Sequence, residues 1–229
     1  MRHPLYITTP EVSENEAVVK VQAEIASMHR QPVKAELVIR DGEGNEVYRK
    51  TEEFKRYQST WEYQFADVKI ASPKLWDCEN PNLYTATVST IGPDGKVTDS
   101  VCERFGIRTV EFGPEYGMKL NGKKVLLKGI ANHHTLGALG AAAYPRAIEK
   151  RIQLLKEFGV NHIRTSHNPY SKEFMNLCDE YGILVVDELY DKWLDQYCGG
   201  RAPWALLWQI LLRQVLILRS GTQRKKHPG

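Results

Sequence analysis

Acidic residues are missing from the end of this 229-residue chain, because no Asp or Glu follows Asp195. Cysteine is scarce as well: the four cysteines show no C-x-x-C spacing, which indicates ordinary thiols rather than metal ligands and leaves a disulfide open. The first sixteen residues contain no apolar stretch of the signal-peptide kind, so no signal peptide is expected in this chain, and the parent protein could be cytoplasmic or exported. A net charge of +3 is too small to favour nucleic acid or a membrane surface as a partner.

Short alternating segments dominate residues 1–112 and predict an antiparallel β-sandwich. Residues 17–25 alternate apolar and polar side chains, which is the period of a strand with one buried face. Two hairpins are expected, with strands 35–40 and 46–50 around the turn at 41–45, and strands 83–91 and 96–104 around the turn at 92–95. Short strands with regular turns are typical of immunoglobulin-like sandwiches, although the Cys…Trp…Cys hallmark of antibody domains is not evident.

The pattern changes over residues 113–203, where strands and helices alternate. Strands are expected at 124–130, 160–164 and 183–187, and helices at 145–158 and 171–181, each helix followed by a glycine. The first helix places Ile148, Ile152, Leu155 and Phe158 on one apolar face. This β-α-β-α-β order requires a parallel sheet with right-handed crossovers. It fits the start of a (β/α)8 TIM barrel and, on periodicity alone, fits a doubly wound sheet equally well.

Residues 204–229 form an atypical tail. Positions 204–218 are densely apolar with Arg213 as the single charge, and the stretch is too short to span a bilayer. One interpretation is an amphipathic helix with Gln209, Arg213 and Gln214 on its polar face. The other is non-native sequence from a shifted reading frame or a gene join, followed by a basic end.

Polar residues gather directly after each predicted parallel strand. They are Asn132, His133 and His134, then Thr165, Ser166, His167 and Asn168, and finally Asp187 and Glu188. Ligands bind at the carboxyl ends of parallel strands, because the loops there converge on one face. The alternatives are loop histidines without a ligand role, an Asp187-Glu188 pair that only caps a strand or pairs with Arg164, and Arg164 as a buried structural cation.

Two further kinds of site fit the sequence less well. A metal site made by His133, His167 and Glu188 lacks the H-x-x-x-H or E-x-H spacing of common metal motifs, so neither a metal nor a cofactor is predicted. A nucleophilic triad of Ser166, His167 and Asp187 is a weaker fit, because Ser166 is not in a G-x-S-x-G turn.

Several motifs occur in a specific order along the chain. They are FGIR (105–108), LNGK (120–123), LKGI (127–130), NHH (132–134), IRTSHNP (163–169), CDEYG (178–182) and VVDE (185–188). This series resembles glycoside hydrolase family 2, which includes β-galactosidases, β-glucuronidases and β-mannosidases. The resemblance runs from about Tyr6 to Pro203 and implies an immunoglobulin-like sandwich at 1–112 followed by the first units of a TIM barrel at 113–203.

The resemblance also implies a sugar site at the barrel mouth. The residues expected to contact a β-linked sugar are His133, Arg164, His167 and Asn168, with Asp187 and Glu188 beside them to orient their neighbours. In the family, the acid/base is the Glu of an Asn-Glu pair after the fourth strand, and the nucleophile is a Glu after the seventh. Neither has a counterpart here, so no catalytic residue is assigned.

The expected function is therefore that of an inactive piece of a retaining exo-β-glycosidase of the β-galactosidase kind. Retaining enzymes need two carboxyl groups about 5 to 5.5 Å apart, which this chain is not expected to supply. The alternative is a non-catalytic binding module built on the sandwich. Self-association is a further expectation, because a three-stranded open sheet leaves an uncovered edge.

Overall fold

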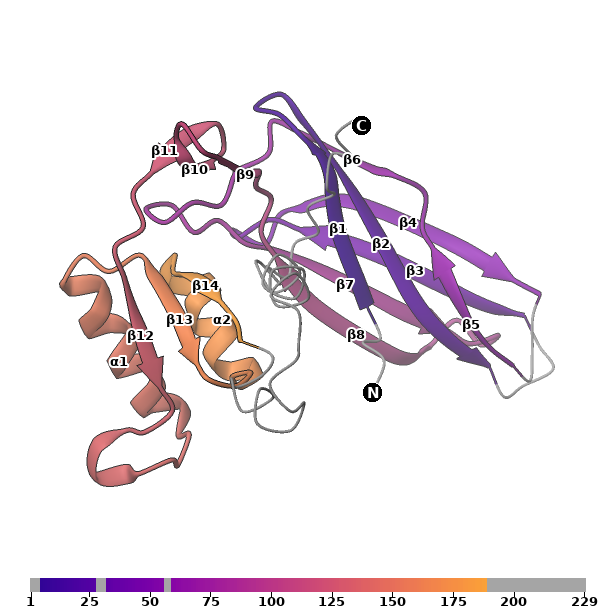
Figure 1. Ribbon diagram of the computed structural model, residues 1–229. Helices are drawn as coiled ribbons and strands as arrows, with labels where there is room; N and C mark the ends of the chain where they lie inside the picture. The colour runs from indigo at the N-terminus through magenta and orange to yellow at the C-terminus, as the bar shows by residue number, and fades with distance from the viewer. Residues whose placement is uncertain (1–4, 28–31, 56–58, 189–229) are drawn as a thin grey trace, which may run out of the picture. The chain divides into compact units, whose positions relative to one another are not determined.

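The computed structural model describes residues 5–27, 32–55 and 59–188 (Figure 1). These residues divide into two compact units. The first unit holds the described residues up to Trp76 together with Asn82–Val110, and the second holds Asp77–Pro81 and the residues from Glu111 onward. The predicted tail at 204–229 lies outside the described residues. None of the helices in the described part is long and apolar enough to cross a membrane.

The first unit contains two antiparallel sheets. One sheet is formed by β1 (Leu5–Val12), β2 (Glu16–Ser27), β5 (Ser59–Gln64) and β6 (Val68–Ala71), and the other by β3 (Val33–Arg40), β4 (Glu46–Phe54), β7 (Tyr84–Ile91) and β8 (Val97–Phe105). In the second sheet the strand order is β4-β3-β7-β8. Both predicted hairpins are confirmed, because β3 pairs with β4 and β7 pairs with β8.

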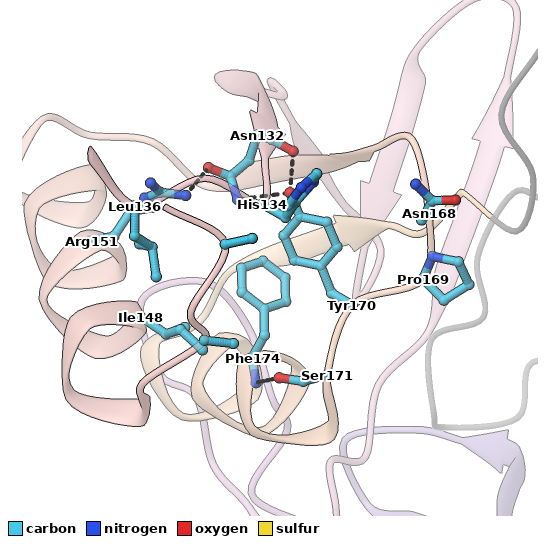
Figure 2. A pocket seen from close by; sticks show the side chains of 12 residues that line it. Asn132, His134, Leu136, Ile148, Arg151, Asn168, Pro169, Tyr170, Ser171 and Phe174 are labelled. Atoms are coloured by element: carbon cyan, nitrogen blue, oxygen red, sulfur yellow. Dashed lines mark hydrogen bonds between the residues drawn. The ribbon is translucent and has the colours of Figure 1, made fainter. Parts of the chain in front are cut away.

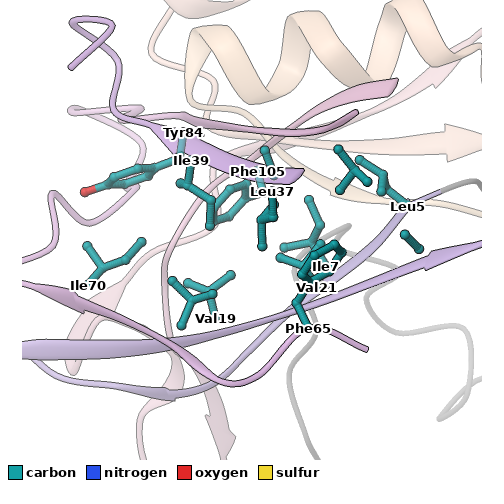
Figure 3. Close-up of a cluster of buried hydrophobic side chains, with 14 of the residues drawn as sticks. Leu5, Ile7, Val19, Val21, Leu37, Ile39, Phe65, Ile70, Tyr84 and Phe105 are labelled. Carbon is teal, nitrogen blue, oxygen red and sulfur yellow. The ribbon is translucent and has the colours of Figure 1, made fainter. Parts of the chain in front are cut away.

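Alternating side chains from both sheets fill one hydrophobic core. Val19 and Val21 of β2 and Leu37 and Ile39 of β3 are fully buried, together with Phe65. Figure 3 shows these side chains gathered in one cluster, with Phe65 contributed by the segment between β5 and β6. Burying an apolar side chain of this size contributes about 1.5–3 kcal/mol. The predicted immunoglobulin-like sandwich is confirmed, and its core is the main source of stability in this unit.

Three short strands follow the sandwich and correct one prediction. β9 (Val110–Gly113), β10 (Gly117–Leu120) and β11 (Lys123–Val125) form a small sheet in the order β11-β10-β9. Asn121 and Gly122 both have positive φ, 51° and 75°, as a two-residue hairpin turn requires. The expected single strand at 124–130 is therefore wrong: this turn folds Lys123–Val125 back onto β10, and the parallel strand begins only at Gly129.

The second unit contains a parallel sheet covered by two helices. β12 (Gly129–His133), β13 (His162–Ser166) and β14 (Leu184–Val186) pair in that order, and both pairings are parallel. A 3-10 turn at Gly137–Leu139 precedes α1 (Pro145–Glu157), and α2 (Lys172–Tyr181) follows β13. Ile148 and Ile152 of α1 and Phe174 of α2 are buried with Ile163 of β13 in one core. The predicted β-α-β-α-β order is confirmed.

The end of α1 differs from the expected apolar face. Ile148 and Ile152 are buried and Leu155 packs against the same core, but Phe158 is 85% exposed. The helix ends at Glu157, and Phe158 has φ −80° and ψ 5°, outside the helical range. The helical period therefore no longer applies at Phe158, and that part of the prediction is wrong.

Ser171 caps the start of α2 and provides a test of this local structure. Its hydroxyl oxygen accepts a hydrogen bond from the backbone N–H of Phe174 at 3.2 Å. Replacing Ser171 by alanine is expected to lower the free energy of unfolding by about 1 kcal/mol, because that N–H loses its partner. Ser171→Asp keeps an acceptor and should lose much less. Urea denaturation followed by helical circular dichroism measures both, and equal losses in the two variants would contradict the cap.

Candidate functional site

The parallel sheet has a helix-covered face and an opposite face, and its register assigns each site residue to one of them. Ile130, Ile163 and Val185 are register partners and pack with the helices. Successive side chains of a strand point to opposite faces. Arg164 is one position past Ile163, and His133 is three positions past Ile130. Both therefore point away from the helices, toward the face that forms the inside of a barrel.

Four of the six predicted site residues meet at the carboxyl ends of the strands. Glu188 Oε1 accepts a hydrogen bond from Arg164 Nε, and Glu188 Oε2 lies 2.9 Å from His167 Nδ1. The ring of His133 meets the ring of His167 edge to face, with 5.4 Å between their centroids. We call these four residues, His133, Arg164, His167 and Glu188, the strand-end cluster. It combines one carboxylate, one guanidinium and two imidazoles.

Exposure within the strand-end cluster separates supporting from contacting groups. The side chain of Glu188 is 14% exposed, whereas that of Arg164 is 51% exposed and that of His167 is 36% exposed. Glu188 therefore lies behind the cation and the imidazole that it binds. Arg164 is not a buried structural cation, and its pairing with Glu188, which the sequence left open as an alternative, is confirmed.

Thr165 fixes the backbone from which Glu188 extends. Its buried hydroxyl donates to Asp187 Oδ1 at 2.8 Å and accepts the backbone N–H of Glu188, also at 2.8 Å. Asp187 thus belongs to the helix-covered side of the strand ends and not to the strand-end cluster. The alternative triad is not assembled in the described residues, since Ser166 Oγ has no hydrogen-bond partner there and Asp187 is bonded to Thr165.

A second network, which the sequence analysis missed, holds the end of β12. Arg151 Nη1 donates to Asn132 Oδ1 at 3.0 Å and to the carbonyl of His133 at 2.9 Å, and Arg151 Nη2 donates to the carbonyl of Thr135. The hydroxyl of Tyr170 donates to the carbonyl of Asn132. Burial raises the pKa of Tyr170 above the ordinary value for a tyrosine.

A signal for Arg151 was present in the sequence. It lies three positions after Ile148 and one before Ile152, so it lies on the apolar face of α1. It is a charged residue among the apolar side chains of that face. An arginine within an apolar stripe needs acceptors for its N–H donors, and here these are the amide oxygen of the buried Asn132 and two backbone carbonyls of exposed residues. Tyr170 carries no comparable signal, because its partner Asn132 is 38 residues away.

A cavity of about 330 Å³ lies on the helix-covered side of the same strand ends. Its walls are Asn132, His134, Leu136, Ala141, Ala143, Ile148, Arg151, Asn168, Pro169, Tyr170, Ser171 and Phe174. Figure 2 shows Tyr170, Phe174 and Ile148 close together, with Asn168 and Pro169 at one side. Asn168, predicted to contact sugar, therefore lines this cavity and not the strand-end cluster. Among the described residues, no three His, Cys, Asp or Glu side chains are placed to hold a metal ion.

Comparison with known families covers most of the chain. Residues 5–108 match the model of glycosyl hydrolases family 2, and residues 115–192 match the TIM barrel domain of the same family. The chain belongs to glycosyl hydrolase family 2. The resemblance of the motif series is confirmed, and the parallel strands are the start of the family 2 TIM barrel and not a doubly wound sheet.

Similar members of family 2 carry glycosidase names. The chain is 37% identical to the β-galactosidase BoGH2A of Bacteroides ovatus, covering 82% of this chain and 22% of that protein. It is 39% identical to a putative β-glucuronidase of Formosa agariphila, covering 98% of this chain and 26% of that protein. A crystal structure of a family 2 member from Bacteroides cellulosilyticus matches with a TM-score of 0.78 and 36% identity, over 93% of this chain and 28% of that one. The chain thus spans about a quarter of the length of these relatives.

Proposed function

We propose that this chain supplies part of the sugar site of a retaining exo-β-glycosidase that acts on a β-galactoside or a related β-linked sugar. The observation that carries the proposal is the strand-end cluster, which places one carboxylate, one guanidinium and two imidazoles at the carboxyl ends of three adjacent parallel strands. Ligands of parallel α/β folds bind at this end. The names of the relatives, β-galactosidase and β-glucuronidase, support a sugar as the ligand.

The cluster is suited to binding hydroxyl groups. A sugar presents hydroxyls that both donate and accept hydrogen bonds, and imidazole and guanidinium groups match them with ring nitrogens and N–H donors. Glu188 holds the Nε of Arg164 and the Nδ1 of His167, so both groups are oriented before a ligand arrives. Prior orientation reduces the entropy lost on binding. Arg164 and His167 are therefore the proposed contacts, and Glu188 is their positioning residue.

The same geometry does not supply the two carboxyl groups that cleavage requires. A retaining mechanism uses a nucleophile and an acid/base about 5 to 5.5 Å apart on the two sides of the glycosidic bond. Of the acidic residues that the structure describes at the strand ends, Asp187 is bonded to Thr165, and Glu188 is bonded to Arg164 and His167. No Asp or Glu follows Asp195 in the sequence. We therefore infer that these 229 residues bind the sugar without hydrolysing it.

A chromogenic assay combined with a binding measurement tests this proposal. The purified chain should release no nitrophenol above the blank from nitrophenyl β-galactoside or β-glucuronide, because neither catalytic role is filled. Saturation-transfer NMR should detect binding of at least one of the methyl β-glycosides. Arg164→Met should weaken that binding about tenfold, the effect of losing about 1.4 kcal/mol.

The control for this variant is Arg146→Met, which removes an arginine from the exposed surface of α1, where it pairs with Glu149. Its sugar binding should equal that of the unmodified chain. Measurable turnover would contradict the claim that cleavage is absent. Failure of every methyl glycoside to bind would contradict the assignment of a sugar site.

A further inference from the structure

We propose that the cavity on the helix-covered side of the strand ends binds a small aromatic carboxylate, as a site separate from the strand-end cluster. The proposal goes beyond the proposed function and does not depend on it. The lining residues all fall between Asn132 and Phe174, so the cavity belongs to the second unit alone. Its volume of about 330 Å³ is near the lower end of the range for ligand pockets, which suits a ligand with a single ring.

The walls of the cavity favour an aromatic ring as the body of the ligand. Aliphatic and aromatic surface comes from Leu136, Ile148, Pro169, Tyr170 and Phe174. The rings of Tyr170 and Phe174 meet edge to face with 4.7 Å between their centroids (Figure 2). A third ring bound beside these two gains from ring contact as well as from burial.

The guanidinium of Arg151 brings a positive charge to these walls. Arg151 is half-buried, and no carboxylate pairs with it in the part of the chain that the structure describes. Its acceptors are the amide oxygen of Asn132 and two backbone carbonyls, all of them neutral. None of the described residues that line the cavity is an Asp or a Glu. A partly desolvated cation without a counter-charge favours an anionic ligand.

The donors that Arg151 has left fit a carboxylate. A guanidinium carries five N–H donors. Two hydrogen bonds start from Nη1 and one from Nη2, so the Nε–H and one N–H of Nη2 have no acceptor among the described residues. Nε and Nη2 are both bonded to the same carbon of the planar group. Two such N–H donors bind the two oxygens of one carboxylate, with charge-assisted hydrogen bonds.

Both helices of the second unit begin beside the cavity. Ala143 lies two positions before the first residue of α1, Ser171 is the N-cap of α2, and both line the cavity. The amino-terminal end of a helix carries a partial positive charge, which stabilises a nearby anion. The helix ends therefore add to the effect of Arg151, and the chemistry of the whole lining matches a ring that carries a carboxylate.

The experiment titrates the full 229-residue chain with phenylacetate and with phenylacetamide, its neutral analogue of the same shape. Ligand-observed NMR should show phenylacetate binding about tenfold more tightly, because only the carboxylate pairs with the guanidinium. Acetate, which lacks the ring, should show no binding at the concentrations that saturate with phenylacetate. Equal affinity for phenylacetate and phenylacetamide, or no binding of phenylacetate, would overturn the proposal.

Arg151→Lys tests the charged half of the site. It keeps the positive charge but cannot offer two adjacent N–H donors in one plane, so phenylacetate should bind at least fivefold more weakly and phenylacetamide nearly as before. A thermal melt shows whether the variant is folded. Arg164→Met is measured beside it, because Arg164 is the exposed guanidinium of the strand-end cluster. If Arg164→Met weakens phenylacetate binding and Arg151→Lys does not, the carboxylate binds the cluster and the cavity site is wrong.

Filling the cavity tests its position without touching Arg151. Ala141 and Ala143, in the loop between the 3-10 turn and α1, line the cavity and are exposed, so Ala141→Phe and Ala143→Phe replace no residue of the buried core. Each should weaken phenylacetate binding at least tenfold. Ala138→Phe is the matched control, because Ala138 is exposed in the 3-10 turn and does not line the cavity. Unchanged binding in both filling variants, or an equal loss in Ala138→Phe, would overturn the cavity as the site.

Discussion

Replacing Gly182 by alanine is expected to destabilise the second unit by about 3 kcal/mol. Gly182 ends α2 in the left-handed region, with φ +68° and ψ 41°, where a side chain costs about 1 kcal/mol or more. A Cβ atom there would also lie 2.4 Å from the carbonyl oxygen of Cys78 and 3.0 Å from its Cα. Lys156 Nζ donates to that same carbonyl at 2.7 Å, so the carbonyl moves only by stretching this bond. Overpacking of this kind adds about 1–3 kcal/mol.

Gly159 is the matched control for this substitution. It ends α1 with φ +76°, but no atom lies within 4 Å of the position its Cβ would take. Gly159→Ala should therefore show only the conformational cost, about 1 kcal/mol. Urea denaturation followed by helical circular dichroism compares the two, since both described α-helices lie in the second unit. Equal losses in the two variants would show that the contact with Cys78 has no energetic weight.

Gly182 separates the part of the fold that can be predicted from the local sequence from the part that cannot. A glycine after an apolar helical pattern predicts a helix end, and both α1 and α2 end where this signal stands. The approach of the Cys78 carbonyl is a contact between positions about a hundred residues apart, and no local pattern encodes it. The same holds for Asp77–Pro81, which lies in the second unit although the flanking segments belong to the sandwich.

The position of the candidate site at one end of the sheet was predictable from the sequence. Which of its residues contact one another was not. Polar residues after three consecutive strands correctly indicated one end of the sheet. Which of these residues lie together depends on the face of the sheet to which each side chain points, and this face alternates along a strand. Predicting it requires the true start of each strand. Because β12 begins at Gly129 and includes His133, that histidine points to the inner face and joins Arg164, His167 and Glu188. A strand ending at Ile130 would have left its direction undefined.

Replacing Thr165, which holds the backbone of Glu188, is the second substitution with a large expected effect. Thr165→Val keeps the shape of the side chain but removes the hydroxyl that donates to Asp187 and accepts from the N–H of Glu188. Both partners are partly buried and would lose a hydrogen bond, at about 1–3 kcal/mol each. We expect the free energy of unfolding to fall by about 3 kcal/mol. Methyl β-glycoside binding should weaken at least tenfold, because the backbone of Glu188 is released and Arg164 and His167 lose their common anchor.

Thr165→Ser separates the hydroxyl from the rest of the side chain. It retains both hydrogen bonds and removes one buried methyl group, so it should cost about 1 kcal/mol and leave sugar binding nearly intact. Gly182→Ala provides the complementary control, since it destabilises the same unit at a distance from the strand-end cluster and should leave binding unchanged wherever the protein is folded. If Thr165→Val loses stability but binds the methyl glycoside as the unmodified chain does, Thr165 supports the fold alone, and the orientation of Glu188 is set by Arg164 and His167 instead.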